Sequence, residues 1–140
     1  MAVDMFINLG PKIKGETKDD AQKAKNDVDV LAWSWGMSQS GSFHAGSGGG
    51  AGKASFQDLS FTKYVDSASP ALMLHLAKGT HIDKATLLVR KAGEGQEKYI
   101  QIDMTKCIVT SVSTGGSGGE DRLTENVTLN FAEVKYEYFK

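Results

Sequence analysis

Alternation between apolar and polar side chains constrains the fold of this chain more than any other feature. The pattern has a period of two residues and runs through residues 3–9, 28–39, 99–112 and 123–140. Successive side chains of a β-strand point to opposite faces, so each of these segments predicts a strand with one apolar face. Residues 56–65, which are rich in aromatic and β-branched side chains, and residues 85–92 complete the expected strands.

The apolar face changes side within the last of these segments. Up to Phe131 the apolar residues occupy odd positions, and from Ala132 onward they occupy even ones. A change of phase by one residue is what a β-bulge produces, so we expect a bulge here and a long, sharply bent strand. Lys106 interrupts the apolar face of residues 99–112 and indicates a bend close to it.

One short helix is expected, from Ser69 to Lys78. Ser69 and Pro70 suit the N-cap and the first helical position, and Gly79 suits the left-handed residue that ends a helix. Leu72, Met73 and Leu76 share one face, which must dock on the sheet because so short a helix is not stable alone. The expected fold is therefore mainly β: an antiparallel β-barrel of two packed sheets with one short flanking α-helix and a long glycine-rich loop.

Composition narrows the classes of partner. The 140 residues suit one compact domain, and a net charge of −1 argues against a nucleic-acid partner. Near-neutral charge also leaves little self-repulsion to oppose self-association. Residues 1–9 lack the features of a signal peptide, and no apolar run approaches the roughly 20 residues of a membrane helix. We expect synthesis in the cytoplasm and no membrane partner.

The glycine-rich run from Gly46 to Lys53 resembles a phosphate-binding loop at first sight. A Walker loop needs glycine at the position of Ser47 and a hydroxyl residue at the position of Ala54, and neither is present. Such a loop also opens a helix, whereas residues 56–65 predict a strand. The favoured interpretation is a flexible hairpin loop over about residues 40–55, with a second flexible loop over residues 114–119.

The sequence offers no other reaction centre. Cys107 is the single cysteine and has no partner at zinc-binding spacing, and the histidines are His44, His75 and His81. No Gly-x-Ser-x-Gly motif is present. We expect no enzyme activity, no cofactor and no metal. Trp33 and Trp35 share a face with Leu31 and Met37, which favours core packing over a sugar-stacking platform.

Five segments, in order along nearly the whole chain, carry a resemblance to a known family. The most specific are the Trp-Ser-Trp-Gly and Asp-Leu-Ser-Phe-Thr-Lys motifs that begin at Trp33 and Asp58. The complete set is Met1–Ile7, Gly15–Thr17, Val30–Gln39, Asp58–Tyr64 and Leu123–Phe131. With these segments the chain resembles the haemolysin-coregulated protein (Hcp) family, the tube protein of the bacterial type VI secretion system.

The resemblance implies a structural, non-catalytic protein. It implies hexameric rings with a central pore that stack into a tube inside a contractile sheath, capped by a spike protein. Small effectors ride in the pore, and the protein reaches the outside of the cell without a signal peptide. Family members often extend further at the C-terminus than Lys140, so weaker polymerisation is expected here.

Two surfaces are predicted on this basis. The glycine loop is expected to contact a neighbouring ring or subunit through Ser42, Phe43, His44, Gly46, Gly48, Gly49, Gly50 and Lys53. The small residues Ala32, Ser34 and Gly36 are expected to line the pore, with close packing against another sheet as the alternative. A phage-type tail tube protein, or a β-barrel that binds a nucleotide or another small ligand, is the rival interpretation.

Overall fold

The computed structural model describes residues 2–41, 51–93 and 95–140 of the chain. Within these residues, the elements in chain order are β1 (Val3–Asn8), η1 (Lys23–Lys25), β2 (Val28–Asp29), β3 (Ala32–Ser34), β4 (Met37–Gly41), β5 (Ala51–Phe56), β6 (Leu59–Tyr64), α1 (Ala68–Lys78), β7 (His81–Lys91), β8 (Lys98–Thr114) and β9 (Thr124–Tyr138). The expectation of a mainly β protein with one α-helix is confirmed.

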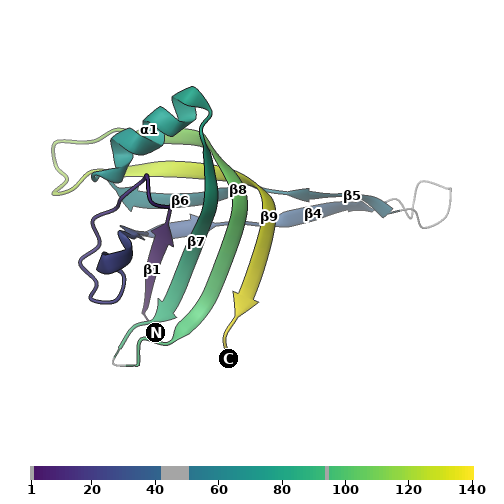
Figure 1. Ribbon diagram of the computed structural model, residues 1–140, viewed down its shortest axis with the longest axis horizontal. Helices are drawn as coiled ribbons and strands as arrows, with labels where there is room; N and C mark the ends of the chain where they lie inside the picture. The colour runs from purple at the N-terminus through teal and green to yellow at the C-terminus, as the bar shows by residue number, and fades with distance from the viewer. Residues whose placement is uncertain (1, 42–50, 94) are drawn as a thin grey trace.

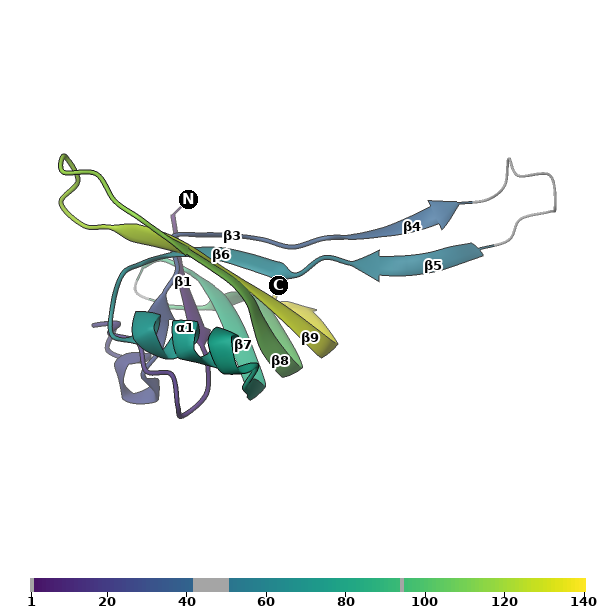
Figure 2. The ribbon, with the colours of Figure 1, turned by 90° about the horizontal axis from the view of Figure 1, so that it is seen from above.

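Seven of the strands form one antiparallel sheet that curls on itself (Figure 1), in the order β2-β1-β7-β8-β9-β6-β3. The layers expected as two packed sheets are thus opposing parts of this one curled sheet, and α1 lies against it. Strands β4 and β5 form a separate two-stranded sheet that projects from the body (Figure 2).

Residues 28–34 join the two ends of the curled sheet. Strand β2 pairs with β1, whereas β3 pairs with β6 on the opposite side. Between them, the Val30 amide donates to the Met5 carbonyl at 3.0 Å and the Leu31 amide donates to the Thr62 carbonyl at 2.8 Å. The prediction of one continuous strand over residues 28–39 was therefore wrong, because the segment changes pairing partner twice and forms β2, β3 and β4.

The core fills the inside of the curled sheet. It is built from alternate residues of β1, β6, β7, β8 and β9, and Ile7, Leu59, Leu87, Met104 and Leu129 are all fully buried. Trp33 and Trp35 pack against it as expected, but Leu31 and Met37 are exposed. Those two residues lie where the chain changes partner, so simple alternation does not apply to them.

The change of phase near the end of the chain is real, although its cause differs from the expected bulge. Phe131 and Val134 both pack against the core. The β8–β9 register is continuous there, and its shift lies between Val109 and Ser111 instead. Lys106 lies on β8 between two residues that pair with Glu133 and Phe131 of β9, and it has a φ of 55°. A left-handed residue departs from the extended backbone of a strand, which agrees with the bend predicted close to Lys106. The bulge expected between Phe131 and Ala132 is not found.

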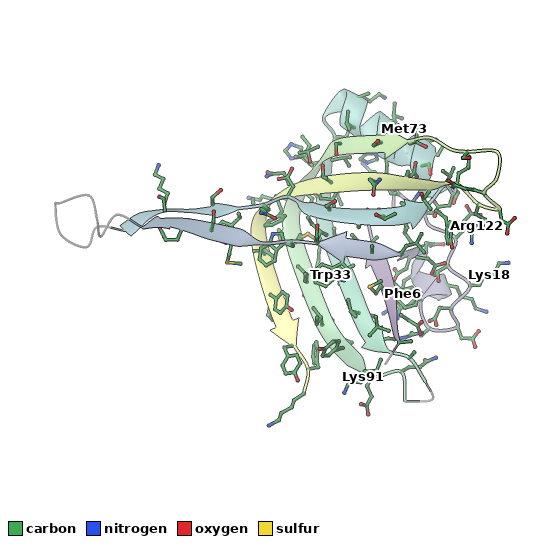
Figure 3. The ribbon with its side chains drawn as sticks, turned by 180° about the vertical axis from the view of Figure 1, so that it is seen from behind. Phe6, Lys18, Trp33, Met73, Lys91 and Arg122 are labelled. Carbon is green, nitrogen blue, oxygen red and sulfur yellow. The ribbon has the colours of Figure 1, made fainter. Side chains whose placement is uncertain are left out.

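Helix α1 ends as the sequence predicts and begins earlier. Gly79 has a φ of 66°, and the Thr80 amide donates to the His75 carbonyl at 2.9 Å. The start lies at Ala68 rather than at Ser69, because an Asp66 carboxylate oxygen accepts the Ala68 amide at 2.9 Å. Leu72 is fully buried, whereas Met73 and Leu76 are partly exposed, so one residue of the expected face provides most of the docking. Figure 3 labels Met73 on the helix and Trp33 on the curled sheet.

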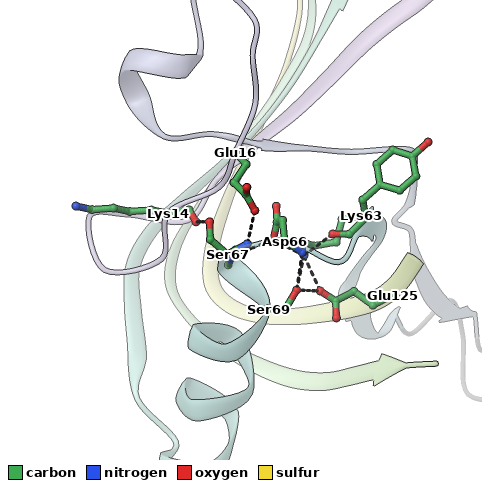
Figure 4. Close-up of polar contacts among 9 residues, drawn as sticks. Lys14, Glu16, Lys63, Asp66, Ser67, Ser69 and Glu125 are labelled. Atoms are coloured by element: carbon green, nitrogen blue, oxygen red, sulfur yellow. Dashed lines mark hydrogen bonds and ion pairs between the residues drawn. The ribbon is translucent and has the colours of Figure 1, made fainter. Parts of the chain in front are cut away.

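A buried polar cluster fixes the first turn of α1 to the sheet (Figure 4). Lys63 of β6 is fully buried and contacts Glu125 of β9, Asp66 and Ser69. Next to it, Ser67 donates from its hydroxyl to the Lys14 carbonyl at 2.9 Å. The cluster therefore joins the helix, two strands and the connection that follows β1.

That connection, residues 10–27, is held to the sheet by a second ion pair. Arg90 of β7 is almost fully buried and forms an ion pair with Asp19, whose carboxylate also accepts the amides of Ala21 and Gln22. Ile13 is fully buried, so the connection contributes a side chain to the core. The short 3-10 helix η1 lies near its end. In the described residues, no helix is long and apolar enough to cross a membrane.

Candidate functional site

Strands β4 and β5 together make an arm, the name used here for residues 37–41 and 51–56. The two strands pair in antiparallel register from Met37 opposite Phe56 to Gly41 opposite Ala51, with an irregularity between Gln39 and Gly41. Small and polar residues dominate the arm, which is why it builds no core of its own. Figures 2 and 3 show it extending well clear of the curled sheet.

The arm changes the interpretation of the glycine loop. Residues expected as loop from about 40 to 55 include the end of β4 and most of β5, and Lys53 is an exposed residue of β5. Ser42, Phe43, His44, Gly46, Gly48, Gly49 and Gly50 lie outside the described residues. Of the residues predicted for a contact with a neighbouring copy, the structure therefore places only Lys53, and places it on the arm.

Four aromatic rings meet at the root of the arm. Trp35 lies nearly parallel to Phe56 (centroids 6.5 Å apart, planes at 13°) and to Tyr136 (6.4 Å, 19°). Its third neighbour is Phe131, with ring centroids 6.2 Å apart. The Trp35 indole N–H donates to the Gln57 carbonyl at 2.9 Å. Phe56 and Tyr136 remain about half exposed, at 52% and 49%, so the cluster is also an apolar surface patch.

The small residues on β3 belong to a wider uncharged surface. Strand register places Ser34, Ser60, Thr128 and Ser111 in one row across four strands, and Ala32, Thr62, Asn126 and Ser113 in the next. We call these eight residues the hydroxyl–amide face. Inward-facing partners such as Phe61 and Val127 are buried between them, so the rows face away from the core.

Hydrogen bonds run along this face. The Thr62 hydroxyl donates to the Asn126 side-chain oxygen at 2.6 Å, and the hydroxyl oxygens of Ser111 and Thr128 lie 2.7 Å apart. Gly36 lies outside the two rows, in the link between β3 and β4. A Cβ at Gly36 would lie 3.3 Å from the Gln57 side-chain oxygen, so this glycine permits a close contact at the root of the arm.

Sequence reasoning identified two of the eight residues and missed six. The alternate hydroxyl and amide residues of 59–64 and 124–130 were a visible signal, since they face away from the apolar positions. What the sequence did not provide was the register that aligns them with Ala32 and Ser34. It also gave no indication that Trp35 contacts the arm.

The titratable groups with shifted pKa values lie in the body rather than on the arm or the hydroxyl–amide face. Burial raises the pKa of the Cys107 thiol to about 11, so this thiol is protonated and inert at neutral pH. Burial likewise raises the pKa of Asp27, opposed by a hydrogen bond from Asn8. No three His, Cys, Asp or Glu side chains among the described residues are placed to bind a metal ion.

A cavity of about 330 Å³ lies where β1 ends and β7 begins, lined by Leu9, Lys12, His75, Ile82 and Lys84 among others. His75 is half-buried there and contacts the Ala71 carbonyl through Nδ1 at 2.8 Å. The inside of the curled sheet, where a ligand-binding barrel would hold its ligand, is filled by core side chains.

Taken together, a curled antiparallel sheet, a projecting arm and an uncharged outer face define a β-protein whose distinctive parts are surfaces. Residues 6–138 match the family model described as "Type VI secretion system effector, Hcp". The chain belongs to the Hcp family of type VI secretion tube proteins, and the resemblance drawn from the sequence is confirmed.

Relatives from several bacteria support this assignment. Protein hcp1 of Pseudomonas aeruginosa is 60% identical over 139 residues, which cover 99% of this chain and 84% of that protein. A crystal structure of Hcp1 from Salmonella typhimurium is 42% identical with a TM-score of 0.82, and the match covers 99% of this chain and 87% of that one. A type VI secretion system effector from Yersinia pestis is 33% identical with a TM-score of 0.80, covering 96% and 89% of the two chains.

Proposed function

We propose that six copies of this chain form a ring with a central pore, and that the rings stack into the inner tube of a type VI secretion system. The observation that carries the proposal is the arm. Family membership identifies the type VI secretion system as the setting, and the arm provides a physical reason for self-association.

In an isolated chain the arm has little to stabilise it. In the described part of the chain, β4 and β5 pair only with each other, so each leaves one edge of backbone N–H and C=O groups open. Two-stranded ribbons are marginally stable in water, and open strand edges favour pairing with another chain. Met37 and Phe56 add exposed apolar area at the root, 56% and 52% exposed. A neighbouring copy that covers the arm supplies what the arm lacks.

The body has the opposite character. Residues 28–34 connect the two ends of the curled sheet, so the body satisfies its own strand edges to a much greater extent. Assembly through the arm therefore leaves the body unchanged. On this proposal, residues 42–50 and Lys53 contact the neighbouring ring or subunit.

The hydroxyl–amide face lines the pore in this proposal. Its eight side chains carry no charge, so a cargo of either sign meets no fixed charge from them. Ser34 and its row offer both donors and acceptors, which suits contact with varied polypeptide surfaces. The alternative, in which these residues pack closely against another sheet, has the support of small size at Ala32 and Ser34 but not of Asn126 or Thr128.

The remaining parts of the proposal follow from the secretion system. The tube is assembled in the bacterial cytoplasm inside a contractile sheath, is capped by a spike protein, and leaves the cell on contraction with small effectors in its pore. Its work is mechanical and requires no catalysis.

The mass of the purified protein in solution tests the proposal. One chain has a mass of 15.0 kDa, so a six-chain ring has a mass of about 90 kDa by light scattering during size-exclusion chromatography. A species at the mass of one chain across the micromolar range would contradict the proposal.

A further inference from the structure

Two short links connect the arm to the body. The entry link, residues 35–36, runs from β3 to β4, and the return link, residues 57–58, runs from β5 to β6. One backbone hydrogen bond joins them, from the Gln57 amide to the Gly36 carbonyl at 2.9 Å. Because the arm belongs to a different sheet from the body, ladder hydrogen bonds do not set its direction.

The entry link is anchored by Trp35. Its ring neighbours Phe56, which belongs to the arm, and Tyr136, which belongs to β9 of the body. Both contacts have nearly parallel rings, and Phe131 of β9 is a third aromatic neighbour. The indole N–H reaches across to the Gln57 carbonyl of the return link. Trp35 therefore contacts the arm, the body and the other link at once.

The return link is anchored by Asp58. Its two carboxylate oxygens accept hydrogen bonds from different strands of the body, at 2.8 Å from the Asn130 side-chain amide and at 2.7 Å from the Thr110 hydroxyl. Hydrogen bonds to a carboxylate are about twice as strong as neutral ones. Both partners are fixed in the curled sheet, so Asp58 ties the second link to β8 and β9.

The β8 irregularity explains why Thr110 can serve this anchor. The β8–β9 register shifts between Val109 and Ser111, which leaves Thr110 without a ladder partner. The Thr110 hydroxyl donates its hydrogen bond to Asp58, so its 2.6 Å contact with Thr128 must have Thr128 as donor. Ser111 then donates to Thr128. A directed chain of hydroxyls thus runs from the hydroxyl–amide face to Asp58 in the return link of the arm.

We infer that Trp35 and Asp58 are positioning residues that fix the direction of the arm relative to the body. A single anchored link leaves rotation about that link free, whereas two anchors on separate links restrict both bending and twisting. The direction of the arm in turn decides where it meets the next copy. This consequence for assembly rests on the proposed function, but the direction of the arm is a property of one chain.

Distances between two spin labels measure that direction. Labels are attached at Lys53→Cys on the arm and Lys78→Cys at the end of α1, both exposed positions, while the buried Cys107 thiol stays unlabelled. Labelled protein is diluted into an excess of unlabelled protein, so that the measured distance lies within one chain. We expect one narrow distance distribution for the otherwise unchanged protein.

Substitutions then test each anchor. Trp35→Ala and Asp58→Ala are each expected to replace the narrow distribution by a broad one, the double variant to broaden it further, and Trp35→Phe to retain most of the narrow peak. Trp33→Ala is the matched control, because Trp33 also packs on the core but lies in β3 of the body. Circular dichroism confirms that each variant keeps its sheet.

Narrow distributions in both single anchor variants would overturn the inference, and so would equal broadening by Trp33→Ala. Ring formation is scored separately on the same samples. If the unchanged protein forms no rings while its distance distribution is narrow and depends on Trp35 and Asp58, the proposed function fails and the positioning role stands.

Discussion

Lys63 and Glu125 lie opposite each other on β6 and β9, and their charged groups meet at 2.6 Å with both side chains fully buried. Asp66 provides a second carboxylate 2.8 Å from the same ammonium group. One buried cation thus holds together two strands and the first turn of α1. Substitutions of the different residues in this cluster should therefore lower the free energy of unfolding by different amounts.

Replacing Lys63 by Met should destabilise the protein more than replacing Glu125 by Gln. Lys63→Met leaves two buried carboxylates without a cation and should cost about 5 kcal/mol, whereas Glu125→Gln leaves the Lys63–Asp66 pair and should cost about 3 kcal/mol or less. Urea unfolding at fixed protein concentration measures both. Lys135→Met, which breaks an exposed pair with Glu137 at 3.6 Å, is the control and should stay within about 0.5 kcal/mol. A smaller effect for Lys63→Met than for Glu125→Gln would contradict this account.

The Arg90–Asp19 pair predicts how stability depends on pH. A hydrogen bond from Arg90 lowers the pKa of Asp19 below its ordinary value of 3.8. Because the folded pKa is the lower one, the stabilisation is fully present above the unfolded pKa and is lost as pH falls through the folded value. The difference in unfolding free energy between the unchanged protein and Asp19→Asn should be constant from pH 7 to pH 5 and shrink below about pH 4.

The neighbouring Asp20 supplies the control for that experiment. Its side chain is 96% exposed and pairs with Lys23 only at 3.6 Å. Asp20→Asn should therefore follow the unchanged protein at every pH. Asp27, whose pKa is raised by burial, has the opposite dependence but is present in all three proteins. A gap between the unchanged protein and Asp19→Asn that is independent of pH down to pH 3 would rule out the assigned role of the pair.

Shortening the glycine loop should separate ring formation from stacking. Deletion of residues 46–50 removes part of the segment that connects the two strands of the arm and leaves the body intact. We expect rings of normal mass that no longer stack into tubes, measured by electron microscopy. Deletion of Gly118 and Gly119 from the second glycine-rich connection is the control and should leave stacking unchanged. Normal tube formation after the first deletion would remove the loop from the interface.

Ser34→Gln tests whether the hydroxyl–amide face lines the pore. A longer side chain at an exposed position of β3 should leave the ring folded and reduce retention of cargo effectors, because it fills space that they occupy. Ser34→Ala is the matched variant, which removes the hydroxyl without adding bulk. Co-purification of a secreted effector with the ring is the readout. Equal retention by the unchanged protein and Ser34→Gln would favour close packing against another sheet instead.

Prediction from the sequence succeeded where local signals decide the structure. Gly79 ends α1 because a left-handed residue is needed there, and Lys106, which interrupts the apolar alternation, has a left-handed backbone conformation. Prediction failed for residues 28–39, since a change of pairing partner depends on strands far away in the sequence. Six of the eight residues of the hydroxyl–amide face were missed for the same reason, because its rows exist only once the register of four strands is known.

Trp35 shows the difference most clearly. The sequence placed it among core residues, which is correct, since it packs against the core. Its contact with Phe56 of the arm depends on the separate pairing of β4 with β5, which local periodicity does not encode. The role of Asp58 depends in turn on the irregularity at Thr110, a feature of the paired strands rather than of either one alone.

Negative-stain electron microscopy of the purified chain tests the central claim most directly. We predict class averages of rings with six-fold symmetry and an open centre, together with side views of stacked rings. Images that show only particles of single-chain size, or rings of another symmetry, would contradict the account.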